Sequence, residues 1–145
     1  MSTSLPLLIW TESLMIGVDA IDAEHQALLT LINDSLRCGE TPFGAEEGAA
    51  MIDRLLGLAI EHFCHEEEVM VRIGYPDFHR HRRAHIKLRE QARFLKRALA
   101  EEGGAAISHA ELAGFLSGWL IDHLAGMDML LRPHIARHVA LNGPL

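Results

Sequence analysis

Ten of the 145 residues are histidines, and two pairs of potential metal ligands stand four residues apart. His62 precedes Glu66, and His81 precedes His85. Four residues advance an α-helix by about 40° around its axis and about 6 Å along it, so both members of a pair can reach one metal ion. Imidazole and carboxylate ligands suit iron and its neighbours, whereas structural zinc sites rely more on cysteine. The spacing therefore indicates a metal site built from histidines and carboxylates.

Two further histidines fall among apolar residues with helical spacing. His25 does so within the segment Asp19–Arg37, and His123 within the segment that starts near Ser108. Asp128 lies five residues after His123, which rotates it by about 140° to another face of a continuous helix. Spacing alone therefore selects the two histidines but does not select Asp128.

Four amphipathic helices are expected to position these side chains. Clusters of helix-breaking residues at 39–44, 74–77 and 103–104 divide the chain, and apolar residues recur with helical spacing between them. The expected helices are Asp19–Arg37, Ala45–Arg72, Phe78–Ala100 and a fourth from about Ser108, where Glu111 completes a capping box. Because the loops between them are short, the sequence predicts an all-α, up-down-up-down four-helix bundle.

The whole chain, residues 1–145, is expected to be one domain. Residues 1–18 would form an N-terminal arm, 19–131 the bundle and 132–145 a short C-terminal extension, in which Pro133 opens a helix to about Ala140. Several side chains are expected in the interior because they are apolar or small and lie on the helices: Ile86, Leu88, Phe94, Leu95, Phe115 and Cys64.

Composition excludes several classes of protein. The net charge of −7 argues against binding to nucleic acid, which requires a basic surface. No apolar run approaches the roughly 20 residues of a membrane span, and the N-terminal segment lacks the basic region of an export signal. The two cysteines form no disulfide framework, as in a reducing compartment. We therefore expect a cytoplasmic protein without nucleic acid partners or membrane insertion.

In order and spacing, the motifs over about residues 10–131 resemble the hemerythrin family, and within it the bacterial single-domain members, the bacteriohemerythrins. The motifs that carry the resemblance are Trp10-Thr11, Gly17–Gln26, His62-Phe63-Cys64-His65-Glu66-Glu67, Tyr75-Pro76, His81, His85, Trp119-Leu120-Ile121-Asp122-His123 and Asp128. The resemblance implies a four-helix bundle that holds two non-haem iron ions joined by an oxo or hydroxo bridge.

The resemblance also implies a role for each predicted ligand. One iron would be held by His81, His85 and His123, the other by His25 and His62, and both would be bridged by Glu66 and Asp128. Of about twelve positions on two octahedral ions, these ligands and the bridging group leave one open, on the iron with two histidines. O₂ would bind there, and the candidates for the pocket around it are Ile21, Phe63, Trp119, Leu120 and Met127.

The function that the resemblance implies is reversible O₂ binding, for storage, transport or delivery to an oxygen-using enzyme, rather than catalysis. The ligand chemistry agrees, because bundle enzymes that activate O₂ use more carboxylates. Five neutral imidazoles make the oxidised states of iron less accessible. Two alternatives stay open: a di-iron enzyme acting on peroxide or nitric oxide, and a regulatory module that senses O₂ or redox state.

Five histidines are left outside this assignment and are expected at the surface: His65, His79, His109, His134 and His138. His134 and His138 repeat the four-residue spacing. They lack a carboxylate partner and an apolar face, so we expect them on a solvated short helix.

Overall fold

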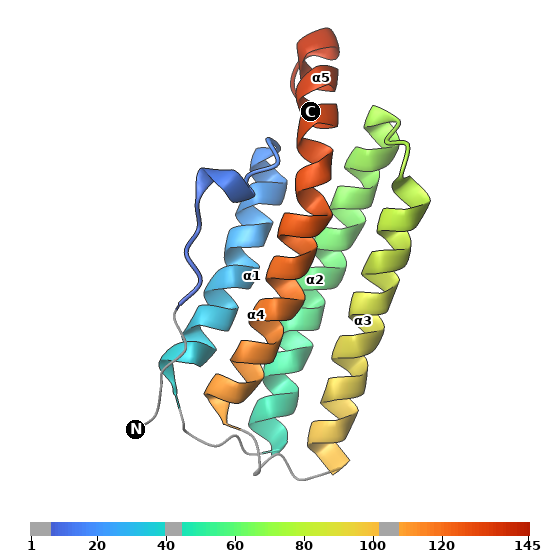
Figure 1. Cartoon of the computed structure of the whole chain (residues 1–145). Coiled ribbons are helices and arrows are strands. Elements are labelled where there is room, and N and C mark those ends of the chain that lie inside the picture. The colour runs from blue at the N-terminus through green and yellow to red at the C-terminus, as the bar shows by residue number, and fades with distance from the viewer. Residues whose placement is uncertain (1–6, 40–44, 102–107) are drawn as a thin grey trace.

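The computed structural model describes residues 7–39, 45–101 and 108–145. Four helices lie side by side and alternate in direction along the chain (Figure 1). They are α1 (Asp19–Arg37), α2 (Ala45–Ile73), α3 (Phe78–Glu101) and α4 (His109–Gly126). Two 3₁₀ turns, η1 (Glu12–Leu14) and η2 (Asp128–Leu130), and a shorter helix, α5 (Leu131–Asn142), accompany them. The predicted all-α, up-down-up-down four-helix bundle is confirmed.

The helix ends follow local signals in the sequence. α1 has the expected bounds, and α2 and α3 each run one residue further than expected. Gly74 follows α2 with φ at +67°, the left-handed conformation that glycine adopts readily at a helix C-terminus. At the start of α4, the Ser108 hydroxyl accepts a hydrogen bond from the Glu111 backbone N–H at 3.1 Å. This is the Ser108 half of the predicted capping box.

Three apolar residues expected in the core are instead exposed: Ile86 by 43%, Phe94 by 67% and Phe115 by 53%. On α3 the cause is that only a narrow stripe of residues faces the interior of the bundle, and other side chains occupy it. That stripe, with alternating steps of three and four residues, contains the buried or partly buried His81, His85, Leu88, Ala92, Leu95 and Leu99. Ile86 and Phe94 lie off the stripe, so placing these two residues in the core was wrong.

The described part of the N-terminal arm, residues 7–18, contains no α-helix and is held against α1 by two polar side chains. The buried Asp22 carboxylate accepts hydrogen bonds from the backbone N–H groups of Ile16 at 2.8 Å and Gly17 at 3.2 Å. Asn33 makes a reciprocal pair with the backbone of Leu8, at 2.7 and 2.8 Å. These bonds hold the partly buried Trp10 against the main apolar core.

The C-terminal helix α5 continues from η2 beyond the end of α4 (Figure 1). It begins two residues before and ends two residues after the expected limits. Pro133 is its third residue, within the first turn, where the missing N–H would have no helical partner. α5 contributes to a second apolar cluster, the end cluster, which contains Ile16, Ile21, Met70, Tyr75, Leu131 and Ile135.

Within the described ranges, no helix combines the length and the apolar character that crossing a bilayer would require.

Candidate metal centre

The seven predicted ligands converge inside the bundle from four helices and one turn. α1 supplies His25, α2 supplies His62 and Glu66, α3 supplies His81 and His85, α4 supplies His123, and η2 supplies Asp128. All seven are buried. Their ligand atoms form two groups, each within 4.8 Å, and both groups contain Glu66 and Asp128. One group adds His81, His85 and His123, and the other adds His25 and His62.

Glu66 divides its two carboxylate oxygens between these groups. Its Oε1 lies 2.7 Å from His81 Nε2 and 3.2 Å from His85 Nε2. Its Oε2 lies 3.3 Å from His62 Nε2 and 3.5 Å from His25 Nε2. A carboxylate in this position has one oxygen available to a cation at either histidine group.

The two carboxylate oxygens of Asp128 are likewise divided between the two groups of histidines. Its Oδ1 lies 2.9 Å from the Nε2 atoms of both His81 and His123. Its Oδ2 lies 3.1 Å from His25 Nε2. Two buried carboxylates therefore span the same two groups of imidazoles.

A break in the helix brings Asp128 into the cluster. α4 ends at Gly126, and Met127 has φ −120° and ψ −49°, outside the helical range. The chain then enters η2, which begins at Asp128. The rotation of about 140° that excluded Asp128 applies only to a continuous helix, so spacing could not identify this residue.

The polar atoms of the cluster are poorly satisfied by the protein alone. Although they lie 2.7–3.5 Å from one another, several of these atoms make no hydrogen bond of suitable geometry in the described structure: Glu66 Oε2, both oxygens of Asp128, and the Nε2 atoms of His81 and His123. Buried polar atoms without partners are costly, and a cation among them would satisfy several at once. Since the donors are imidazole nitrogens and carboxylate oxygens, the residues fit a pair of transition-metal ions such as iron.

Without metal, His25 and His81 bind protons more tightly than a free imidazole does. Burial by itself lowers the pKa of His25 and of His81, but the adjacent carboxylates of Asp128 and Glu66 outweigh it and raise both pKa values to about 9. Burial and the charge of Glu66 raise the pKa of Asp128, yet His123 and His25 outweigh them and lower it to about 2. The carboxylates therefore stay ionised and attract positive charge.

Of the five pocket candidates, Phe63 is in direct contact with histidines of the cluster. The Phe63 ring stacks on the His85 ring with centroids 4.1 Å apart, and it lies 5.7 Å from the His62 ring. Trp119 and Leu120 belong to the same main core as Phe63, and the Trp119 indole N–H donates to the Leu88 carbonyl at 3.2 Å. Met127, partly buried, directly precedes Asp128.

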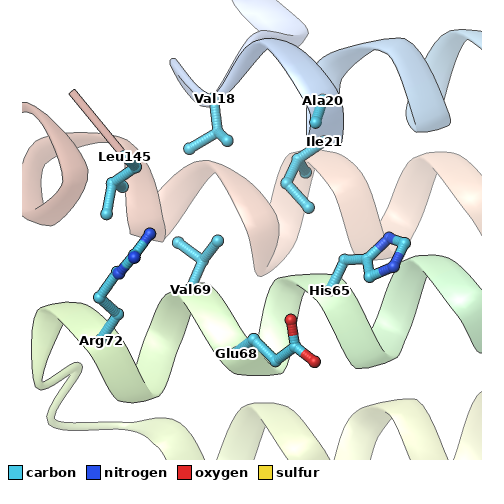
Figure 2. A pocket seen from close by; sticks show the side chains of 8 residues that line it. All are labelled: Val18, Ala20, Ile21, His65, Glu68, Val69, Arg72 and Leu145. Atoms are coloured by element: carbon cyan, nitrogen blue, oxygen red, sulfur yellow. The ribbon is translucent and has the colours of Figure 1, made fainter.

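Ile21, the fifth candidate, is buried and forms part of the wall of a surface cavity of about 460 Å³ between α1 and α2 (Figure 2). The cavity is lined by Val18, Ala20, Ile21, His65, Glu68, Val69, Arg72 and Leu145. Ile21 lies one helical turn before His25 on α1, and none of the seven predicted ligands lines this cavity.

Two carboxylates beside the cluster were not predicted. Glu24 contacts the outer nitrogen of His62, and Glu67 contacts that of His85. Their sequence signal was weak, because each is simply the neighbour of a predicted ligand on its own helix. Each carboxylate contacts a histidine of a different helix: Glu24 of α1 contacts His62 of α2, and Glu67 of α2 contacts His85 of α3.

The predicted burial of the remaining histidines and of Cys64 was correct only in part. His65, His79 and His134 are exposed, as expected, whereas His138 is half-buried. His109 is buried, with its Nε2 3.2 Å from a Glu47 carboxylate oxygen, so the surface prediction was wrong. Cys64 is exposed rather than buried. The reason is the position of Cys64 directly after Phe63 on α2. Phe63 is buried in the core, and the next residue of a helix is rotated by about 100° around the axis, which turns Cys64 toward solvent.

Comparisons with known proteins agree with this geometry. Residues 16–135 match the family model described as the hemerythrin HHE cation binding domain. A bacteriohemerythrin of Stenotrophomonas maltophilia (strain R551-3) is 32% identical over 139 residues, which cover 93% of this chain and 86% of that protein. A myohemerythrin of Riftia pachyptila is 28% identical, with 83% of this chain and 87% of that protein covered.

Among solved structures, the crystal structure of a wild-type hemerythrin superposes with a TM-score of 0.75 and 26% sequence identity. The superposition covers 88% of this chain and 97% of that one.

Proposed function

Because the chain belongs to the hemerythrin family, we propose that it binds O₂ reversibly at a centre of two non-haem iron ions. In this proposal, His81, His85 and His123 hold one iron, and His25 and His62 hold the other. Glu66 and Asp128 would each contribute carboxylate oxygens to both. O₂ would bind at the iron held by His25 and His62.

One observation carries the proposal. Glu66 and Asp128 each direct their two oxygens toward different groups of buried imidazoles, at 2.7–3.5 Å from the nearest Nε2 atoms. A single metal site would not need two carboxylates that span two groups. The buried ligand atoms without hydrogen-bond partners support the same arrangement. Glu66 Oε2, both oxygens of Asp128 and the Nε2 atoms of His81 and His123 would each gain a bond to metal.

The protein's own contribution is to hold and enclose the metals. When bound, ferrous iron supplies the electrons and the vacant position that retain O₂. The five neutral imidazoles favour the reduced state of the iron. The apolar side chains of Phe63 and Ile21, together with the rest of the proposed lining, would keep water from the site, which slows irreversible oxidation.

The proposed function is tested by an optical cycle. The protein is loaded with ferrous iron without air, exposed to O₂, and then deoxygenated repeatedly. We expect a visible absorption band that appears with O₂ and disappears on its removal in every cycle. Rapid conversion to a stable ferric form in the first cycle, together with turnover of peroxide or nitric oxide, would contradict the carrier role and favour an enzyme.

A further inference from the structure

Two of the five proposed histidine ligands have a carboxylate on the ring nitrogen that faces away from the centre. His62 Nδ1 lies 3.4 Å from Glu24 Oε1. His85 Nδ1 lies 3.1 Å from Glu67 Oε2. The two histidines belong to different groups, so each proposed iron has one ligand with such a partner.

The second oxygen of each of these carboxylates is held by a cationic or protonatable side chain at the surface. Glu24 Oε2 lies 2.6 Å from His65 Nδ1, and Glu67 Oε1 lies 3.4 Å from Arg82 Nε. The side chains of Glu24 and Glu67 are exposed by 24% and 23%, so both are largely covered. Both carboxylates are thus fixed from two sides, between a buried imidazole and a surface group.

This arrangement has a clear consequence for metal binding. An imidazole that binds a metal through Nε2 carries its proton on Nδ1, and an acceptor at Nδ1 fixes this tautomer and the ring orientation. A carboxylate acceptor also makes the imidazole a stronger donor. By contrast, the Nδ1 atoms of His25 and His81 have no hydrogen-bond partner in the part of the chain that the structure describes.

We propose that Glu24 and Glu67 are positioning residues for the metal centre, one for each iron, which orient His62 and His85 and strengthen them as ligands. The inference rests on the proposed di-iron site and adds two residues from outside it. Neither carboxylate would touch iron or O₂, so their effect would pass entirely through the histidines.

The test measures how tightly each variant holds ferrous iron, by competition with a ferrous chelator in the absence of O₂. Glu24→Ala and Glu67→Ala are each expected to weaken iron binding about 10- to 100-fold. Glu24→Gln and Glu67→Gln keep an acceptor oxygen and lose only the charge, so a smaller loss is expected. Glu68→Ala is the matched control, because Glu68 is exposed, follows Glu67 on α2 and lines the cavity in Figure 2.

A second measurement separates positioning from a merely structural role. If the carboxylates strengthen the imidazoles, the reduction potential of the iron centre should rise in the Ala variants, since a weaker donor stabilises oxidised iron less. Thermal unfolding of the iron-free proteins shows whether each variant folds. Should an Ala variant fail to fold, the isosteric Gln variant decides the question through the same two measurements.

The outcomes also separate this inference from the proposed function. A wild-type protein that retains iron, with Glu24 and Glu67 variants that bind it as tightly as Glu68→Ala does, would overturn the inference and leave the proposed function intact. A wild-type protein that retains no iron would overturn both.

Discussion

Substitution of His81 by alanine is expected to cost the protein its iron. His81 Nε2 lies 2.7 Å from Glu66 Oε1 and 2.9 Å from Asp128 Oδ1, so this one imidazole adjoins both proposed bridging carboxylates. The loss of affinity should exceed the roughly 10- to 100-fold that follows from losing an outer partner of a ligand.

The measurement is the iron content of the purified variant after anaerobic loading and removal of excess metal. His79→Ala is the matched control, because His79 is an exposed histidine two residues away on the same helix. Full iron content in His81→Ala, with a wild-type spectrum, would show that the ligand assignment is wrong.

Removal of iron is expected to lower the stability of the fold, and to lower it more as the pH rises. In the iron-free chain the pKa values of His25 and His81 are about 9, above the ordinary value of 6.5. Groups with a raised folded pKa contribute stability that is complete below about pH 6.5 and is lost as the pH rises through about 9. Iron binds the neutral imidazoles, so the loaded protein should keep its stability across this range.

The difference in unfolding temperature between loaded and iron-free protein should therefore widen from pH 6.5 to pH 9. A change of at least several degrees is expected, since about 1 kcal/mol corresponds to about 3 °C in a chain of this size. Asp128→Asn is the control, because it removes a carboxylate that raises both pKa values and should flatten the pH dependence of the iron-free protein. An iron-free wild type equally stable at pH 6.5 and 9 would contradict this account.

The fold could be predicted from the sequence almost completely, because its determinants are local. Breaker clusters mark the three connections, and helical periodicity marks each inward stripe. The errors occurred where competition between side chains decides the outcome. Phe94 is strongly apolar, like the adjacent Leu95, yet it is 67% exposed because other residues occupy the inward-facing stripe of α3. Sequence alone does not rank such candidates.

The site was predictable only where its geometry follows a regular helix. The pairs His62 with Glu66 and His81 with His85 could be identified by spacing, because both members lie on one helical face. Asp128 could not, because the helix breaks at Met127 and only resemblance to a family pointed to it. Glu24 was missed because its importance arises from a contact between two helices.

The most direct test of the central claim is the number of iron ions per chain. The protein would be loaded with ferrous iron without air, freed of excess metal, and analysed for iron and protein together. This account predicts close to two irons per chain, and anomalous scattering from crystals of the loaded protein should place both among the seven buried ligands. A protein that binds one iron or none, or that holds iron elsewhere, would contradict it.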